Sequence, residues 1–355
     1  MMTRICAMAI LALAPSAHAA ATSPTAPMPA PVPGKLQTYR DWTIGCDNGN
    51  GCETVSLIPE QGDPSDTALM IGLRRDAGPA ARPFLWTSTN DESLSGTLDF
   101  IVDGRKAMSA PMTRGELRIE GPQASALAAA IARGTVLEVK QGARLIGKPS
   151  LAGAAAAFRY LDAQQGRAGT ITALVATGPL PAQAVKAAPA LPVLRRPALA
   201  AAKAVSLWRQ ELASAGRISG CTDEMEDRDV EIHPLGHERA LVLVPCGAGA
   251  YNFSSVPLIA TGAPGRRTFA FARFDYQPGW SENASEPMLV NAGWNEATAE
   301  LSSYAKGRGL GDCGSAETYM WDGAMFRLTE ATAMGECRGA WHWLTLWQAK
   351  VVPAK

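Results

Sequence analysis

Charged and aromatic side chains gather around one glycine-dense stretch, residues 306–314, and the segment that follows it up to Cys337. The stretch holds four glycines in nine residues, and glycine permits backbone conformations closed to other residues. Lysine and arginine are hard to bury, so the bases here must point outward or pair with an acid. A fixed loop with exposed charge is a candidate recognition site; the alternative is that it only shapes a corner of the fold. The candidate ligand or partner residues are Lys306, Arg308, Asp312, Trp321, Asp322 and Arg338.

Catalytic chemistry has weaker support in the sequence. Serine hydrolysis needs a serine, a histidine and an orienting acid, but the chain has no G-x-S-x-G motif and few histidines. Carboxylate pairs of the glycosidase kind can be drawn from Asp312, Glu317 and Asp322, as in most domains of this size. We therefore expect non-catalytic binding of an envelope protein or glycan. A hydrolase acting on glycan or peptide is one alternative, and an assembly or stability factor for another envelope protein is a second.

Metal and cofactor motifs are incomplete. Glu231, His233, His237 and Glu238 flank residues 234–236, which are typical of a hairpin turn. Two histidines across a hairpin can bind a metal, but a third ligand is not in place. Residues 247–253 are glycine-rich without the spacing of a nucleotide loop. We expect neither a metal nor a cofactor.

The charge distribution argues against nucleic acid as a partner. Residues 35–178 carry 15 basic and 15 acidic side chains, and residues 204–355 carry 13 and 18. Phosphate binding is mostly electrostatic, so a neutral unit and a mildly acidic one are poorly suited to it.

Tryptophans cluster late in the sequence. Trp341, Trp343 and Trp347 are separated by even numbers of residues, so they would share one face of a strand. Such a strip could stack on sugar rings or grip an extended peptide. Leu344 and Leu346 would occupy the opposite face, which favours a strand buried between two layers.

The N-terminus has the pattern of a secretory signal peptide at residues 1–19. Arg4 precedes an apolar run, and small residues lead to expected cleavage after Ala19. The run is shorter than the roughly 20 residues that span a bilayer, and no later segment approaches that length. Residues 20–35, rich in Ala and Pro, are expected to form a flexible leader. The prediction is an exported, periplasmic protein without a membrane span.

Six cysteines remain after the predicted cleavage. An even number in an oxidising compartment indicates disulfides, and the spacings do not fit a zinc site. Proximity in the sequence and the division described next favour Cys46–Cys52, Cys221–Cys246 and Cys313–Cys337.

The chain is long enough for two domains with cores of their own. We expect a mainly β protein with a few helices (α+β): a β-sandwich-like unit with two helices at 36–178, a basic Pro/Ala-rich linker at 179–203, and an antiparallel β unit with a leading helix at 204–355. In the first unit, strands are predicted at 41–46, 52–58, 69–74, 84–87, 96–102, 116–119, 136–140 and 170–176, and helices at 125–132 and 150–165. In the second, a helix runs from 205 to a stop at Gly216, and strands are predicted at 240–244, after 253, and at 268–274, 288–294, 300–304, 318–321, 325–329 and 341–352.

Five motifs occur in a fixed order: residues 46–52, 246–252, 306–314, 321–323 and 337–339. Together they resemble the exported Gram-negative family called domain of unknown function 1176, over nearly the whole mature chain. That resemblance implies a periplasmic location. The first unit is also similar to the secreted invasion-associated locus B proteins, at residues 42–46, 102–104, 126–134 and 150–157, which implies a β-sandwich-like fold.

Overall fold

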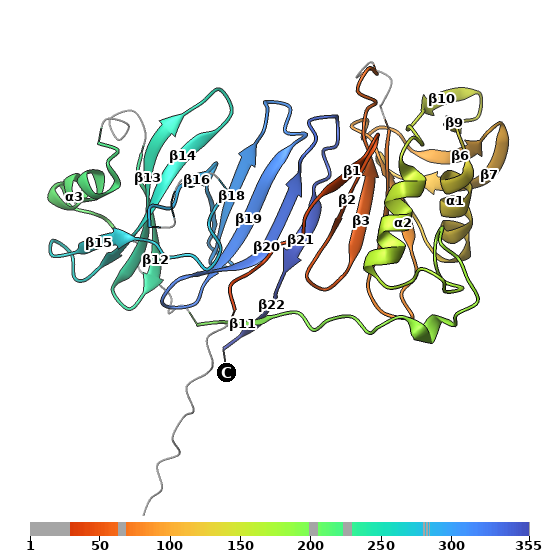
Figure 1. Cartoon of the computed structure of the whole chain (residues 1–355). Helices are drawn as coiled ribbons and strands as arrows, with labels where there is room; N and C mark the ends of the chain where they lie inside the picture. The colour runs from red at the N-terminus through yellow and green to blue at the C-terminus, as the bar shows by residue number, and fades with distance from the viewer. Residues whose placement is uncertain are drawn as a thin grey trace, which may run out of the picture. The chain divides into compact units, whose positions relative to one another are not determined.

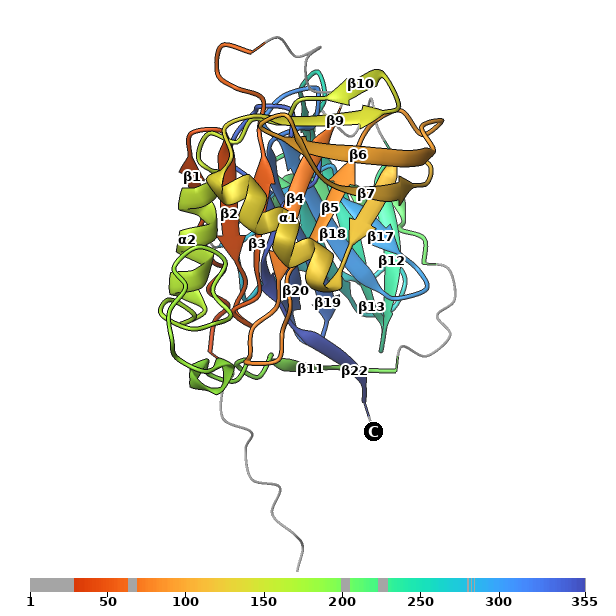
Figure 2. The same cartoon turned by 90° about the vertical axis from the view of Figure 1, so that its right-hand side faces the viewer.

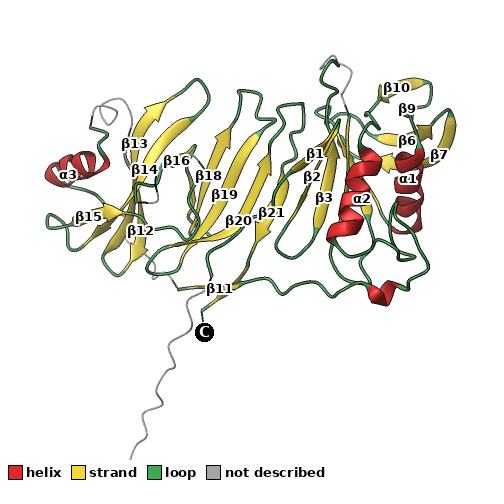
Figure 3. Ribbon diagram, viewed as in Figure 1, coloured by secondary structure: helices red, strands yellow, loops and turns green. Residues whose placement is uncertain are grey.

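The computed structural model describes residues 29–62, 69–198, 205–222, 229–279, 281, 283 and 285–354. Most of its secondary structure consists of short strands, many with alternating buried and exposed side chains. Of the described residues, 43% lie in strands or bridges and 12% in helices, so the prediction of a mainly β protein is confirmed; Figure 3 shows the predominance of strands. The predicted signal peptide lies outside the described residues. Pro31–Lys355 forms one compact unit, and the division into two domains joined at 179–203 stays a prediction. No described helix is long and apolar enough to cross a membrane.

The first part of the chain forms two antiparallel sheets. The six-stranded sheet has the order β1 (Gln37–Tyr39), β2 (Trp42–Cys46), β3 (Cys52–Ser56), β4 (Met70–Arg75), β5 (Phe84–Ser88) and β8 (Glu116–Ile119). The four-stranded sheet has the order β10 (Arg144–Gly147), β9 (Leu137–Gln141), β6 (Gly96–Val102) and β7 (Arg105–Met112).

Two helices cover the six-stranded sheet, α1 (Gly121–Arg133) and α2 (Ala154–Gln164) (Figure 2). The buried stripe of α2 includes Ala157, Phe158 and Leu161, as helical spacing predicts. This stripe lies on β2 and β3, where the rings of Phe158 and Trp42 are nearly perpendicular, with their centres 5.5 Å apart. A large aromatic pair of this kind fixes the helix against the sheet.

The later part of the chain forms two five-stranded antiparallel sheets and a short parallel pair. One sheet has the order β12 (Glu231–Gly236), β13 (Arg239–Ala248), β14 (Phe253–Thr261) and β15 (Thr268–Phe271), with β16 (Leu289–Val290) beside β14. Helix α3 (Arg209–Ser219) packs on it. The other has the order β17 (Gly293–Asn295), β18 (Glu300–Lys306), β19 (Gly314–Trp321), β20 (Phe326–Met334) and β21 (Leu344–Gln348). The pair is β11 (Val193–Arg196) with β22 (Lys350–Pro353).

The β17–β21 sheet is covered on both faces (Figure 1). On one side Tyr319 and Leu328 pack with Leu241 of β13. On the other, Leu344 of β21 packs with Val55 of β3. β21 is therefore buried between layers, as the apolar residues on both of its predicted faces indicate.

The strand predicted at 170–176 is absent, because a buried carboxylate bends this segment. Asp162 of α2 is fully buried and accepts hydrogen bonds from the backbone N–H groups of Leu174, Val175 and Ala176, at 2.8, 2.8 and 3.1 Å. Three successive amides pointing at one side chain are incompatible with the alternating directions of a strand.

Three further expectations differ from the structure. Gly216 lies inside α3, and the helix ends at Gly220, which has the positive φ of a C-terminal cap, +74°. Within the predicted linker, which also has a 3₁₀ turn at Ala182–Ala184, β11 pairs with β22 and Arg196 bonds Glu300. Within the predicted leader, Gly34 donates its N–H to the carbonyl of Leu346 at 2.8 Å, so packed structure starts earlier than expected.

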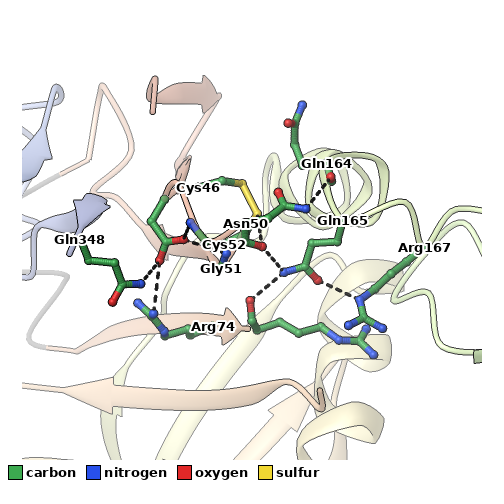
Figure 4. Close-up of a disulfide and its surroundings, with 12 residues drawn as sticks. Cys46, Asn50, Gly51, Cys52, Arg74, Gln164, Gln165, Arg167 and Gln348 are labelled. Atoms are coloured by element: carbon green, nitrogen blue, oxygen red, sulfur yellow. Dashed lines mark hydrogen bonds and ion pairs between the residues drawn. A yellow bond between two sulfur atoms is a disulfide. The ribbon is translucent and has the colours of Figure 1, made fainter. Parts of the chain in front are cut away.

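Three disulfides join Cys46 to Cys52, Cys221 to Cys246 and Cys313 to Cys337, the pairs that sequence proximity favours. The first closes the β2–β3 hairpin, as Figure 4 shows. Gln165 donates to the carbonyl of Asn50 at 2.9 Å and accepts from Arg167 at 2.8 Å (Figure 4). The small cysteine loop is thereby tied to the end of α2.

Arg338 ties the third disulfide to the start of the fold. Its guanidinium donates to the carbonyls of Ile58 and Arg40, both at 2.7 Å, and to the Asp41 carboxylate at 2.5 Å. The side chains of Arg338 and Asp41 are only 13% and 14% exposed. Arginine suits this place because its planar group offers several donors in fixed directions.

We expect Arg338→Ala to lower the free energy of unfolding by about 2–4 kcal/mol, because it removes three charge-assisted hydrogen bonds and takes the cation from a largely buried carboxylate. The free energy of unfolding of Arg338→Lys should lie between those of Arg338→Ala and the unchanged chain, since an ammonium group cannot reproduce the fixed donor directions of the guanidinium. Urea unfolding measures both. The control is Arg105→Ala at an exposed position of β7, and an Arg338→Ala variant as stable as this control would contradict the assignment.

Candidate functional site

The loop between β18 and β19, residues 307–313, is held by its own backbone. The N–H of Gly307 donates to the Cys313 carbonyl at 2.8 Å, and the N–H of Gly311 donates to the Arg308 carbonyl at 3.0 Å. Gly311 has a φ of +69°, in the left-handed region that favours glycine. The glycines therefore specify a tight and fixed loop, which we call the 307–313 loop.

Arg308 and Asp312 form a two-pronged ion pair within this loop. Nε and Nη2 of Arg308 lie 2.7 and 2.5 Å from the two carboxylate oxygens of Asp312. The hydrogen bond from Arg308 lowers the pKa of Asp312. Oδ2 of Asp312 also accepts the N–H of Gly339 at 2.7 Å. Asp312 is thus consumed by internal bonds, whereas the Arg308 side chain stays 43% exposed.

Asn252 clamps the start of the loop. Its Nδ2 donates to the Lys306 carbonyl at 2.8 Å, and its Oδ1 accepts the Lys306 N–H at 3.2 Å. Asn291 in turn donates to Oδ1 of Asn252 at 3.0 Å. Sequence reasoning gave Asn252 no role, although it ends one of the motifs that carry the family resemblance.

One apolar and two basic side chains reach the surface at this loop: Leu310, Arg308 and the half-buried Lys306, the last residue of β18. Leu310 is 78% exposed. The Lys306 ammonium lies 5.9 Å from the centre of the Tyr304 ring, and the described residues provide it with no ion pair. Together with Arg308, these side chains project from a backbone that is already ordered.

The other three predicted site residues lie elsewhere and have structural contacts. Trp321 is buried in the core at the far end of β19, roughly 23 Å of strand from Gly314. Asp322 accepts the N–H groups of a turn and bonds Arg327 at 2.6 Å. Arg338 bonds residues 40, 41 and 58, as described above. The structure therefore brings together only Lys306, Arg308 and Asp312.

The predicted tryptophan strip does not form. β21 begins at Leu344, so Trp341 and Trp343 precede the strand and point to separate neighbours. Trp341 bonds Ser88 at 3.3 Å, the ring of Trp343 stacks on Tyr304 at 4.6 Å, and Trp347 joins the core on the other side of the sheet. Even spacing predicted a shared face for the three tryptophans, but it applies only within a strand, and β21 starts at Leu344 instead of residue 341.

A histidine–carboxylate pair does form. His342 Nε2 lies 3.1 Å from Oε1 of Glu53, the same oxygen that accepts Trp86 Nε1 at 2.8 Å. Burial raises the pKa of Glu53, but hydrogen bonding to His342 and the charge of Arg74 outweigh it and lower the pKa overall. Among the described residues, no serine or cysteine bonds His342, so the pair lacks the nucleophile of a hydrolytic triad.

His233, in β12, lies between two acids. Its ring nitrogens are 3.1 Å from Glu296 and 3.3 Å from Glu231, and the ring stacks on Trp294. His237 instead sits in the hairpin turn with a φ of +50°. In the described ranges, no group of three or more metal-ligating side chains occurs.

A pocket of about 330 Å³ opens beside the β17–β21 sheet. Its lining combines a strongly buried acid with mostly apolar walls, from Pro31–Gly34, Tyr276, Ser315, Glu317, Ala331–Ala333 and Leu346.

Glu317 is the chemically unusual group of this pocket. The residue is 4% exposed, and burial raises its pKa from 4.5 to about 7, against the lowering effect of the Ser315 hydroxyl and the Gly279 amide. Its Oε2 is buried without a hydrogen-bond partner. A carboxyl group with a pKa near neutrality is a common mark of a functional site.

The burial of Glu317 could have been predicted from its neighbours in the sequence. Glu317, Tyr319 and Trp321 alternate along β19, so they share one face. An acid on the same face as two large aromatic residues is expected to be buried.

Comparison with known proteins shows similarity to one protein family and to one curated relative. A family model described as "Protein of unknown function (DUF1176)" matches residues 36–350. "Uncharacterized protein YpfG" of Escherichia coli (strain K12) is 30% identical over 331 residues, which cover 88% of this chain and 92% of that protein. No solved structure gives a significant match.

We expect Glu317→Gln to be more stable than the unchanged chain at pH 8, by up to about 3 kcal/mol. The folded pKa lies above the unfolded value, so stability falls as pH rises from 4.5 to about 7. Below pH 4.5 both states hold the proton and the difference vanishes. The facing titratable groups, Tyr276 and Tyr319, have raised pKa values and stay neutral in this range.

Urea unfolding at pH 4 and pH 8 measures the effect. Glu330→Gln, at an exposed position of β20, is the control and should show no such gain. A Glu317→Gln variant that is destabilised equally at both pH values would contradict the pKa assignment.

Proposed function

The chain belongs to the DUF1176 family, and we propose that it is an exported, non-catalytic binding protein that captures a protein partner of the cell envelope. The observation that carries this proposal is the 307–313 loop, whose backbone is fixed while Leu310 and Arg308 remain exposed. A loop ordered before contact loses little conformational entropy on binding. The internal bonds of Asp312 and Asn252 supply that order.

The exposed groups favour a protein over a glycan. Sugar recognition by stacking needs open aromatic faces, but Trp321 is buried and Trp343 is covered by Tyr304. The 37% exposed Trp341 bonds Ser88 of β5 and takes no part in the loop. An apolar tip flanked by an ammonium and a guanidinium instead fits a segment with an apolar side chain between acidic ones. Arginine beside apolar groups is typical of the energetic centres of protein interfaces.

Export to the periplasm belongs to the same proposal. The three disulfides support it, because such bonds persist in oxidising compartments and are rare in the cytosol. The predicted signal peptide at 1–19 is consistent with this location.

We expect the double change Lys306→Glu and Leu310→Asp to reduce recovery of the envelope partner at least tenfold while leaving the melting temperature unchanged. Both side chains are free of the bonds that hold the loop, whereas changing Arg308 would strip Asp312 of its cation. Recovery is measured by cross-linking pull-down from cell envelopes with quantitative mass spectrometry. Leu145→Asp, at a 46% exposed position, is the matched control. Equal recovery with the double variant and the control would remove the loop as the site.

A further inference from the structure

One carboxyl group in the β17–β21 sheet is both buried and incompletely bonded. Glu317 is 4% exposed and its Oε2 lacks a hydrogen-bond partner. Leaving a buried polar atom unpaired costs free energy that a partner would recover. Native structures keep few such atoms, so each one calls for an explanation.

The pocket beside Glu317 contains nothing that neutralises it. Among the described lining residues, Glu317 is the one charged side chain. Ser315 and Tyr276 are neutral neighbours, and much of the remaining wall is aliphatic, from Val32, Leu346 and nearby prolines and alanines. Asp275, which also contributes to the raised pKa of Tyr319, is another acid, and it lies 3.7 Å from Arg327.

We propose that this pocket binds a small organic molecule carrying a primary ammonium group on a short aliphatic body. The ammonium would donate to the Glu317 carboxylate, forming a charge-assisted hydrogen bond, and the aliphatic part would lie against Val32 and Leu346. The χ3 torsion of glutamate is soft, so a small turn of the carboxyl group presents Oε2 to the pocket. The volume of about 330 Å³ is at the lower end for ligand pockets, which fits a small ligand.

This site is separate from the 307–313 loop and does not depend on the partner proposed there. An ammonium group can come from a free amine or from a lysine side chain of another protein. Both share the chemistry that the pocket selects.

The test uses the full chain and a matched set of five-carbon probes: n-pentylammonium, n-pentanol and pentanoate. Calorimetry at pH 8 should give at least tenfold tighter binding of pentylammonium than of pentanol, and no binding of pentanoate. The peptide acetyl-Gly-Lys-Gly-amide tests whether the pocket accepts the ammonium group of a lysine side chain as well as that of a free amine. Lowering the pH to 5.5 should weaken pentylammonium binding by about tenfold or more, because Glu317 becomes protonated while the amine stays charged.

Glu317→Gln should lose the preference for the cation and bind pentylammonium and pentanol equally, whereas the exposed control Glu330→Gln should behave as the unchanged chain. Equal binding of all three probes by the unchanged chain, or tight pentylammonium binding by Glu317→Gln, would overturn the proposal. Because neither variant alters the 307–313 loop, failure here leaves the pull-down result for Lys306 and Leu310 unaffected.

Discussion

The guanidinium of Arg338 is the contact on which the arrangement around the 307–313 loop depends. It reaches Arg40 and Asp41, in the turn between β1 and β2, and Ile58, just after β3, and so fixes the segment that follows Cys337. The adjacent disulfide passes this constraint to Cys313, and the N–H of Gly339 passes it to Asp312. The loop is therefore positioned by the first sheet as well as by its own glycines. This explains how a short surface loop with few apolar contacts can hold one conformation.

Two acids of β19 and its preceding loop show opposite solutions to burial. Asp312 is nearly buried but receives Arg308 and Gly339, and its pKa is lowered. Glu317 is equally buried, lacks a cation, and its pKa is raised. The first arrangement contributes to structure, because both carboxylate oxygens of Asp312 accept hydrogen bonds. In the second, the buried Glu317 carboxyl group has no cation beside it. The free energy cost of burying it must be offset by packing elsewhere in the sheet.

Much of the fold could be predicted from local pattern, and the site only in part. Alternation placed β2 to β6 close to their observed ranges, and proximity gave the three cysteine pairs. Alternation located β18 to β20 as well, but the predicted ranges 318–321 and 325–329 cover only about half of β19 (Gly314–Trp321) and β20 (Phe326–Met334). The errors come from contacts between distant residues. Asp162 bends 170–176, and β22 recruits residues of the predicted linker. Arg338 looked like a surface base because its acceptors, mostly backbone carbonyls, lie nearly 300 residues earlier. Glu317 was visible as an acid, but its isolation from any cation depends on the tertiary fold.

The lining of the Glu317 pocket combines residues 31–34 with Leu346, more than 300 residues later in the sequence. The hydrogen bond from Gly34 to Leu346 closes this junction. Such a junction forms only after a very long loop has closed, which is entropically costly and slow. A chain synthesised from its N-terminus thus has no complete pocket until β21 has been made. Its ligand can bind only to finished molecules and would mark those that have completed folding.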